Sequence, residues 1–314
     1  MNNAIEIRRY VPQEQAQWDS LIMRSANGTF LFLRGYMEYH AHRFEDFSLM
    51  IYHKGALVAL LPANRTGNTV TSHGGLTYGG VITDATVTSA LLLDIFDAIA
   101  HYLRQNDIAY FDYKLVPHIY HSYPHEAEQY ALFRMGAVRT ACSLSSAIDL
   151  TAPLRYAELR RRGVKRATQC GVQVVTSDNY APFWHILESN LQERHQVKPV
   201  HSLEEITLLH NRFPQQIRLH TALLDGETVA GCVVYNTGVV AHAQYISASE
   251  QGKECGALDM LFAHLIEQEY SHCRYFDFGI STEKGGAHLN SGLLAQKEGF
   301  GARGIIYETY RITL

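Results

Sequence analysis

The sequence predicts an α/β protein with two tandem domains, each a mixed sheet covered by helices. Its 314 residues are about twice the usual length of one domain. The two halves also match each other at eight positions without a gap when Leu93 is aligned with Leu258. The matching first-half residues are Leu93, Asp94, Ala98, Tyr110, Phe111, Asp112, Gly136 and Ala137. Because these identities cluster in corresponding elements, we infer an internal duplication and predict domains at residues 1–150 and 151–314.

Both halves show the same order of elements. A helix around Trp18 or Trp184 is followed by a hairpin, whose turn is residues 53–55 (HKG) or 224–226 (LDG) between alternating strands. A third strand, a long helix, an aromatic strand and a short helix come next. The long helices carry apolar residues at the 3.6-residue period. These residues are Leu92, Ile95, Phe96, Ile99 and Leu103 in the first half, and Leu258, Leu261, Phe262 and Leu265 in the second.

Composition excludes several classes of protein. The five cysteines form no CxxC pair, which suits a reducing compartment, so we expect a cytoplasmic protein. No segment has the roughly 18 uninterrupted apolar residues of a membrane span. A net charge of -4 predicts no general attraction to DNA. One basic stretch, residues 154–167 (LRYAELRRRGVKRA), is either a solvated helix face or a binding surface for a phosphorylated substrate.

Two segments lack a counterpart in the other half. Residues 72–80 (SHGGLTYGG) lengthen the first half and include Tyr78, whereas residues 193–205 (ERHQVKPVHSLEE) lengthen the second and include His195 and His201. Loops rich in Gly, Tyr and His often carry function. We therefore expect Tyr78, His195 and His201 to contact substrate, with Tyr78 closing the site from the first half.

The order of elements, together with HGGLTYGG, RHQVKPVHSLEE, HAQY, FDFGISTEKGGAHLNSGL and QKEGFGAR, resembles the GNAT acyltransferases, in particular their FemABX-like tandem branch. The resemblance implies transfer of an acyl group, such as acetyl, from acyl-CoA to an amine. It also implies that this amine belongs to a small-molecule or lipid-linked acceptor, such as an amino sugar of cell-surface glycan biosynthesis. Two alternatives stay open: an aminoacyl-tRNA-dependent transferase acting on a peptidoglycan precursor, and a non-catalytic ligand-binding relative.

The sequence departs from single-domain GNAT enzymes in two places. Those enzymes cradle the CoA pyrophosphate on a Gly-rich loop at a helix N-terminus. In the matching residues 249–260 (SEQGKECGALDM), Lys253 and Gly256 suit cofactor binding, but Leu258 occupies the last small-residue position. The position of the usual general-acid Tyr is held by Ala295.

The aromatic strand of the second half supplies further candidate residues. Side chains alternate along a strand, so Tyr275, Asp277, Gly279 and Ser281 are expected to share one face. Gly279 replaces Lys114 of the first half and leaves space for a donor beside the backbone. We expect Asp277 to orient or deprotonate the amine, with Ser281, Thr282 and Asn290 as polar lining. The alternative for Asp277, which Asp112 repeats, is a structural strand-end acid.

The segment HAQYIS, residues 242–247, is expected to be a strand beside Asp277, with His242, Gln244 and Ile246 on one face and Tyr245 on the other. His is well suited to proton transfer near neutral pH, so His242 is the second catalytic candidate, and Gln244 and Tyr245 are substrate-binding candidates. We expect Lys297 merely to complement a helix end. Pro117 and Pro124 argue against a regular helix through His118, His121 and His125, and no Cys or acid pair completes a site, so no metal site is predicted.

Overall fold

The computed structural model describes residues 5–314, apart from the side chains of residues 194 and 195. The chain forms two compact units. The first contains residues 1–143, 284–288 and 306–314, and the second contains residues 144–283 and 289–305. Both units are therefore discontinuous in sequence, whereas we had expected a single division after residue 150. That residue 150 marks the boundary between two independently folding domains stays a prediction.

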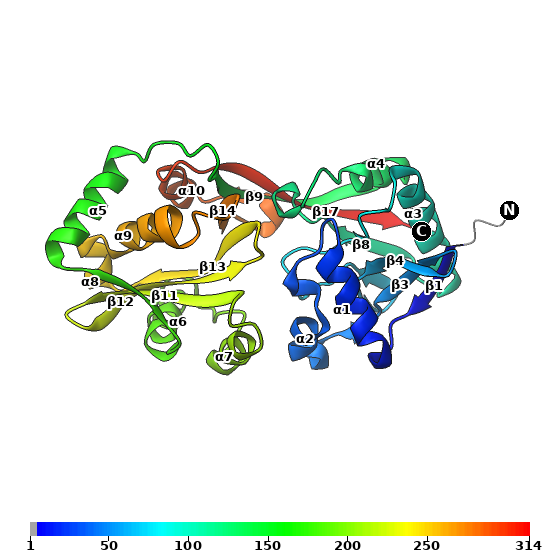
Figure 1. Cartoon of the computed structure of the whole chain (residues 1–314), viewed down its shortest axis with the longest axis horizontal. Coiled ribbons are helices and arrows are strands. Elements are labelled where there is room, and N and C mark those ends of the chain that lie inside the picture. The colour runs from blue at the N-terminus through cyan, green and yellow to red at the C-terminus, as the bar shows by residue number, and fades with distance from the viewer. Residues whose placement is uncertain (1–4) are drawn as a thin grey trace. The chain divides into compact units, whose positions relative to one another are not determined.

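The first unit has strands in two groups (Figure 1). One is an antiparallel sheet of β1 (Ile5–Arg9), β3 (Leu49–His53), β4 (Ala56–Leu61) and β7 (Ile82–Thr83) in that order. The other places β17 (Arg303–Thr313) beside β8 (Tyr110–Lys114), then β6 (Thr69–Thr71), β5 (Asn64–Thr66) and β2 (Glu45–Asp46). The helices are α1 (Gln15–Arg24), α2 (Arg34–Met37), α3 (Ser89–Gln105) and α4 (Ala127–Arg134). The five apolar residues predicted for the long helix are all buried in α3, which confirms its inward face.

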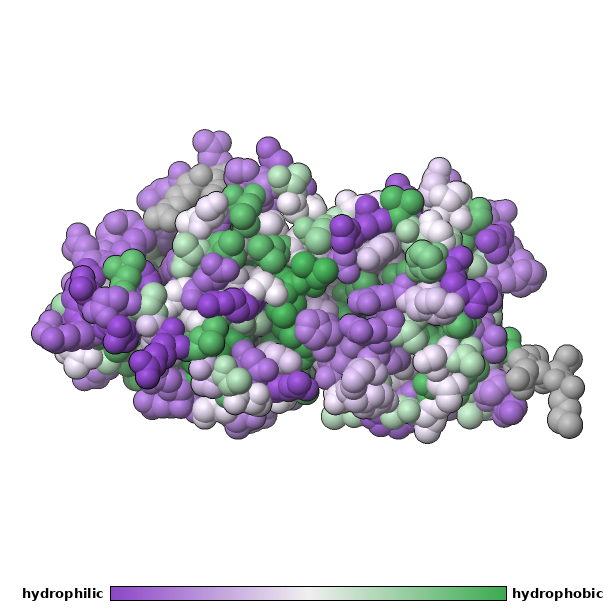
Figure 2. All heavy atoms as spheres, turned by 90° about the horizontal axis from the view of Figure 1, so that it is seen from above, coloured by the Kyte–Doolittle hydropathy of each residue, from purple (hydrophilic) through white to green (hydrophobic). Residues whose placement is uncertain are grey.

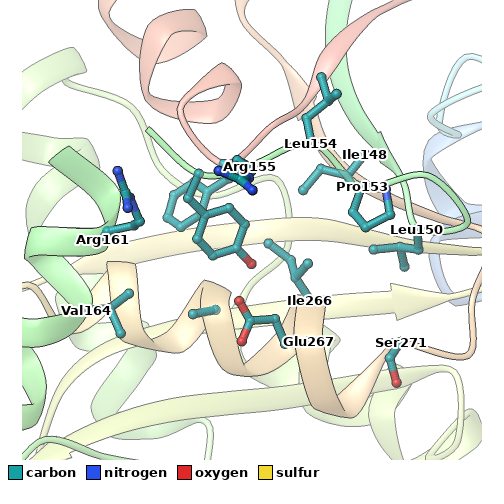
Figure 3. A pocket seen from close by; sticks show the side chains of 13 residues that line it. Ile148, Leu150, Pro153, Leu154, Arg155, Arg161, Val164, Ile266, Glu267 and Ser271 are labelled. Carbon is teal, nitrogen blue, oxygen red and sulfur yellow. The ribbon is translucent and has the colours of Figure 1, made fainter. Parts of the chain in front are cut away.

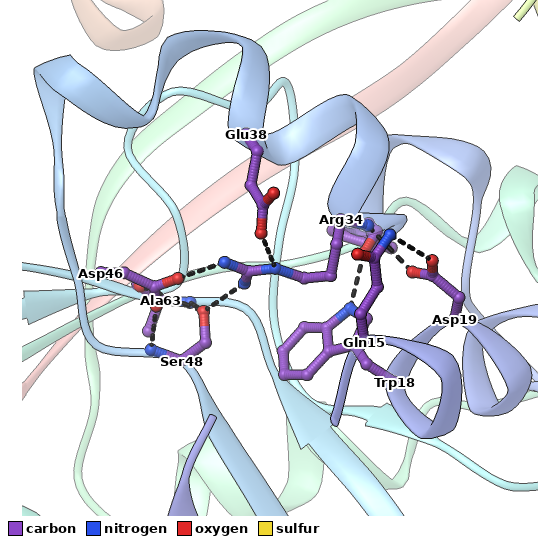
Figure 4. Close-up of polar contacts among 9 residues, drawn as sticks. Gln15, Trp18, Asp19, Arg34, Glu38, Asp46, Ser48 and Ala63 are labelled. Atoms are coloured by element: carbon purple, nitrogen blue, oxygen red, sulfur yellow. Dashed lines mark hydrogen bonds and ion pairs between the residues drawn. The ribbon is translucent and has the colours of Figure 1, made fainter. Parts of the chain in front are cut away.

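A buried arginine joins several segments of this unit (Figure 4). Arg34 forms ion pairs with Glu38 and Asp46, and its guanidinium lies 3.9 Å from the centroid of the Tyr10 ring. Burial alone would raise the pKa of Asp46, but the charge of Arg34 and the hydrogen bond from Ser48 outweigh it and lower that pKa. Carboxylates and aromatic rings thus surround the buried guanidinium and replace contacts that it would make with water.

The second unit is built around one mixed sheet. Its strands are β10 (Gln173–Ser177), β11 (Ile217–Leu224), β12 (Glu227–Asn236), β13 (Val240–Ala248), β14 (Tyr275–Ile280) and β9 (Val138–Asp149), in that spatial order. Neighbours pair antiparallel except β13 and β14, which are parallel. The predicted hairpin turns are confirmed in both units, since Lys54, Gly55, Asp225 and Gly226 have positive φ, as type I′ turns require.

Helices cover both faces of this sheet (Figure 1). The helices α5 (Glu158–Cys170), α9 (Ala257–His264) and α10 (Ser291–Glu298) lie on one face, and α6 (Ala181–His195) and α7 (Leu203–Arg212) lie on the other. The short helix α8 (Glu250–Cys255) precedes α9, and η5 (Leu265–Glu269) continues α9 as one π-helical turn. This mixed α/β fold agrees with the predicted fold class. Core aromatic rings of Phe262, Phe276 and Phe278 pack edge to face between α9 and β14.

Candidate active site

The candidate site lies where two neighbouring strands of the second unit separate. β13 and β14 pair in parallel over Val240–His242 and Tyr275–Asp277, so that His242 stands directly beside Asp277. Beyond His242, β13 continues to Ala248 without pairing to β14 in the part of the chain that the structure describes. The backbone edge of β13 that faces the opening therefore retains polar groups able to bind a ligand.

A cavity of about 560 Å³ occupies this opening. Leu187, Asn190 and Leu191 line it from α6, on one face of the sheet. Phe262 of α9 and Leu293 and Lys297 of α10 line it from the other face. Because side chains from both faces contribute, the cavity passes through the gap between the strands. Its lining includes Ile246 and Ser247 of β13 and Phe278 of β14, immediately beyond the His242–Asp277 pair.

Asp277 is the centre of a buried polar cluster. Its side chain is fully buried, and its Oδ2 lies 2.9 Å from Nδ1 of His242. The hydroxyl of Ser145 donates to Oδ1 at 2.5 Å, and the backbone N–H of Gly279 donates to the same oxygen at 3.1 Å. A carboxylate with these donors fixes the orientation of the imidazole ring. The predicted neighbourhood of His242 and Asp277 is confirmed, whereas their catalytic roles stay predictions.

The duplicated acid of the first unit has different partners. Asp112 is bound by Arg311 of β17 through two hydrogen bonds of 2.7 Å each. This bidentate pair is a cross-strand contact that stabilises the sheet. The duplication thus repeats the acid but repeats neither the histidine nor the serine.

A β-bulge changes the predicted faces of β13. The pairing with β12 shifts between Val233 and Val234, which leaves Gln244 as the extra residue on β13. Ile246 consequently packs against the core beside α9, although we had placed it on the face of His242. Tyr245, which we had placed on the opposite face, contacts Trp184 of α6 at 5.0 Å between ring centroids. Only the tertiary pairing reveals this reversal.

Lys297 was wrongly expected to serve only as a helix-end cation. Its side chain is buried, and its Nζ donates to the carbonyl oxygens of Gly279 and Ile280, each at 2.8 Å. Burial lowers the pKa of Lys297 to about 8, with Asp277 acting in the opposite direction. Gly279 has a φ of 76°, which favours glycine, and this bend turns the end of β14 toward Lys297.

The residues expected to hold a cofactor surround a second, smaller cavity. This cavity of about 220 Å³ is lined by Lys253, Gly256 and the side chains of Arg160, Arg166 and Asp259. Helix α8 occupies most of the segment where a phosphate loop was expected. Arg160 forms an ion pair of 2.6 Å with Asp259 in the first turn of α9, and Lys253 pairs with Glu250. Three cations, Lys253, Arg160 and Arg166, and the carboxylate of Asp259 therefore face any anion that binds here.

The remaining candidates of the second unit have clear positions. His201 is buried, with its Nδ1 2.5 Å from the Tyr245 hydroxyl. Ser281 is buried too, and its hydroxyl has no hydrogen-bond partner within the described residues. The Thr282 hydroxyl accepts a hydrogen bond of 3.1 Å from the backbone N–H of Leu144. Asn290 caps the N-terminus of α10 and also lines the cavity of about 560 Å³. His195 ends α6, but its side chain lies outside the described part of the structure.

Tyr78 is a buried core residue of the first unit. Its hydroxyl donates to the Thr29 hydroxyl at 3.1 Å, and its ring packs against Phe32 and Tyr120. Its expected role in closing the site stays a prediction. Sequence reasoning also missed Ser145, because it lies 132 positions before Asp277 and no local pattern marks it.

Among the side chains that the structure describes, no three from His, Cys, Asp or Glu are grouped to hold a metal ion. None of the helices described for this chain is long and apolar enough to cross a membrane.

Comparisons with known proteins relate part of this chain to one protein family and its fold to several solved structures. Residues 155–286 match the family model of an acetyltransferase (GNAT) domain, a range that includes β13, β14 and the His242–Asp277 pair. No curated protein is similar to this sequence.

Several solved structures share the fold over nearly the full chain. FemX has a TM-score of 0.69 at 11% identity, covering 98% of this chain and 97% of its own. L-PGS from Bacillus licheniformis has a TM-score of 0.62 at 12% identity, with 96% and 91% covered. A tandem GNAT protein from the clavulanic acid biosynthesis pathway has a TM-score of 0.53 at 14% identity, with 99% and 98% covered. Identities this low support a shared fold and leave the substrates open.

Proposed function

We propose that this chain, which has the tandem GNAT fold of the FemABX-like proteins, is an N-acyltransferase that moves an acyl group from acyl-CoA to an amine. The observation that carries the proposal is the opening between β13 and β14, which begins beside the His242–Asp277 pair and leads into the cavity of about 560 Å³. An extended donor can lie in such an opening against unpaired backbone, with its reactive carbon next to the pair.

The proposed chemistry is acyl transfer with proton removal by His242. The neutral amine attacks the thioester carbonyl, the new C–N bond forms, and the C–S bond breaks to release the CoA thiolate. With the Nδ1 proton donated to Asp277, Nε2 of His242 takes the proton from the amine and can return it to the thiolate. Buried Asp277 stabilises the resulting imidazolium, because an opposite charge in a low-dielectric site interacts strongly.

Two further groups support the transition state in this proposal. The backbone N–H groups of β13 beyond His242, beginning at the Gln244 bulge, are candidates to stabilise the oxyanion. The Lys297 side chain, which lines the opening, adds positive charge near the thiolate as it leaves.

The donor site we propose combines both cavities. The acyl group and its pantetheine arm occupy the larger opening, and the pyrophosphate binds at the smaller cavity beside Lys253, Arg160 and Arg166. Leu258 and Gln296 line both cavities, so the two are neighbours. The acceptor that we propose is the amine of an amino sugar, a choice that rests on the family resemblance alone.

A second candidate donor is an aminoacyl-tRNA. Asp259 shares the smaller cavity with the cations, and its carboxylate repels a pyrophosphate placed there. Helix α8 also replaces the open loop that would wrap around phosphate oxygens. An aminoacyl ester does not carry a pyrophosphate, so these two observations support aminoacyl-tRNA as the second candidate donor.

The first experiment measures thermal stabilisation of the purified chain by acetyl-CoA, decanoyl-CoA and free CoA. A donor present at about one hundred times its Kd should add roughly 2.7 kcal/mol of stability to the unit that binds it. The same ligands are then tested for thiol release with a panel of amino sugars. A midpoint shift with acyl-CoA followed by amine-dependent thiol release supports the proposal.

Variants separate catalysis from binding. We expect His242→Ala to lower kcat by about 100-fold to 10,000-fold while the acyl-CoA midpoint shift is retained. The matched control is His272→Ala, which removes an exposed imidazole of the same unit. If no CoA species shifts the midpoint but a charged tRNA is deacylated in the presence of an amine, the donor is aminoacyl-tRNA. Tight sugar-nucleotide binding without transfer from either donor would overturn the enzyme assignment.

A further inference from the structure

A third cavity in the second unit lies apart from the proposed donor site. It has a volume of about 810 Å³ and opens beneath the segment of residues 150–157, which connects β9 to α5 (Figure 3). Phe300 lines both this cavity and the donor opening, and its buried ring packs against Tyr156, Phe262 and Phe278. Phe300 therefore forms a wall between two separate cavities.

Most of the residues that line the third cavity are apolar. Ile148 and Leu150 come from the end of β9 and the following segment, Val164 comes from α5, and Ala263 and Ile266 come from α9 and η5. Leu154, which lines the cavity, is 47% exposed. Figure 2 shows apolar side chains gathered on this side of the second unit and bordered by hydrophilic ones. An apolar cavity of this size that opens to solvent is suited to a mainly hydrocarbon ligand.

One buried hydroxyl belongs to the residues that line this apolar space. The hydroxyl of Tyr156 is inaccessible to solvent and lies beside the Glu267 carboxylate, which acts on it through its charge and a hydrogen bond. Burial and the nearby Glu267 carboxylate raise the pKa of Tyr156.

The rim of the cavity carries the basic stretch of an otherwise acidic chain. Arg155 and Arg161 line one edge, and Glu267 lies at the opposite edge (Figure 3). The segment 155–166 contains six Arg or Lys residues and a single acid, Glu158, whereas the whole chain has a net charge of -4. Arg161 pairs with Glu158, and Arg155 is exposed. The rim thus favours an anionic group at the Arg155 edge.

We propose that this cavity binds an amphiphile with one alkyl chain and one anionic head group. The chain packs against Ile148, Val164 and Ile266, and the head group meets Arg155 and Arg161. The site is independent of the acyl-transfer reaction, so it stands whether or not the proposed function holds.

The test is calorimetric titration of the full chain with octanoate, decanoate and dodecanoate below their micelle concentrations. The affinity should rise about fourfold for each added methylene while the chain still fits, since each buried methylene contributes about 0.8 kcal/mol. Decanol, which keeps the chain and lacks the charge, should bind about fivefold more weakly than decanoate. Butyrate, which keeps the charge and lacks the chain, should give no detectable heat.

Two variants and one control assign the binding to this cavity. Arg155→Gln should weaken decanoate about fivefold and leave decanol unchanged, because it removes an exposed charge without altering the apolar wall. Ala263→Phe fills the cavity and should weaken both ligands at least tenfold, provided that circular dichroism shows an intact fold. Lys165→Gln, which removes an exposed charge from α5 outside the lining, should change neither affinity.

Three results would overturn the proposal. One is an affinity that does not depend on chain length, and another is equal decanoate binding by wild type, Arg155→Gln and Ala263→Phe. The third is binding to phosphatidylglycerol vesicles, but not to phosphatidylcholine vesicles, without any decanoate binding. That third pattern would assign the basic rim to a membrane surface.

Discussion

Lys297 is the residue whose charge matters most for the proposed reaction near neutral pH. Its ammonium holds two carbonyl oxygens at the end of β14, and burial lowers its pKa to about 8. As the pH rises through that value, the folded protein loses this charge beside the leaving thiolate. We therefore expect the transfer rate at saturating substrate to fall above pH of about 8, as measured in a rate-against-pH profile.

Arginine provides the matched control, because a guanidinium stays charged throughout this range. Lys297→Arg should remove the fall above pH 8, whereas Lys297→Met should lower the rate at every pH. A Lys297→Met variant with the wild-type rate and profile would show that this cation has no part in transfer.

Protonation of the buried Glu128 makes the stability of the first unit depend on pH. Glu128 is buried, it accepts a 2.5 Å hydrogen bond from the Tyr113 hydroxyl, and burial raises its pKa to about 8. Between pH 4.5 and 8 the folded state therefore holds a proton that the unfolded state releases, so stability falls as the pH rises. At about 1.4 kcal/mol for each pKa unit, the loss is on the order of a few kcal/mol.

Glu128→Gln should flatten this dependence and stabilise the protein at pH 8. Urea unfolding between pH 4.5 and 8.5 measures how the free energy of unfolding depends on pH. The control is Glu126→Gln, which changes an exposed neighbour and should keep the wild-type dependence. The idea fails if Glu128→Gln retains the wild-type slope.

At the scale of elements, α5 and α9 approach closely through Gly163. A β-carbon at this position would overlap the Asp259 carboxylate, which is paired with Arg160. Alanine favours a helix by about 1 kcal/mol over glycine. Even so, we expect Gly163→Ala to destabilise the second unit by about 1–3 kcal/mol, because α9 must move or the ion pair must break.

Gly292 of α10 is the matched control for this substitution. A β-carbon there makes only an ordinary contact of 3.7 Å with Asn290. Gly292→Ala should therefore be neutral or stabilising by up to about 1 kcal/mol. Thermal unfolding followed by calorimetry measures both changes, and equal shifts for the two variants would contradict the close approach.

At the scale of the whole molecule, the C-terminal strand completes the core of the first unit. Residues 306–314 belong to that unit, and Ile312 of β17 is only 1% exposed while it pairs with Phe111 of β8. Ile312→Ala should thus lower the free energy of unfolding of the first unit by about 2–5 kcal/mol.

Ile306 lies on the same strand and is 48% exposed, so Ile306→Ala should change stability by less than about 0.5 kcal/mol. Limited proteolysis can show which unit loses stability. Ile312→Ala should speed cleavage within residues 5–143 and leave residues 144–283 protected. Faster cleavage confined to the second unit would contradict the division of the core.

The order of helices and strands could be predicted from the sequence because the patterns that indicate it are local. The apolar period of α3, the turns at residues 53–55 and 224–226 and the repeated aromatic strand each depend on neighbouring residues alone. The proximity of His242 and Asp277 was also predictable, because strand order in a repeated unit determines which strands are adjacent. The discontinuity of the two units could not be predicted, since it depends on where β17 pairs.

The sequence by itself determined the duplication and the order of elements, because these follow from periodicity and spacing. Only the tertiary structure decided what each residue contacts. The bulge at Gln244 exchanged the faces of Tyr245 and Ile246, and Lys297 turned inward to the carbonyl groups of β14. Ser145 reached Asp277 across 132 positions of sequence. Such contacts depend on strand register and on burial, which arise only when distant segments pack together.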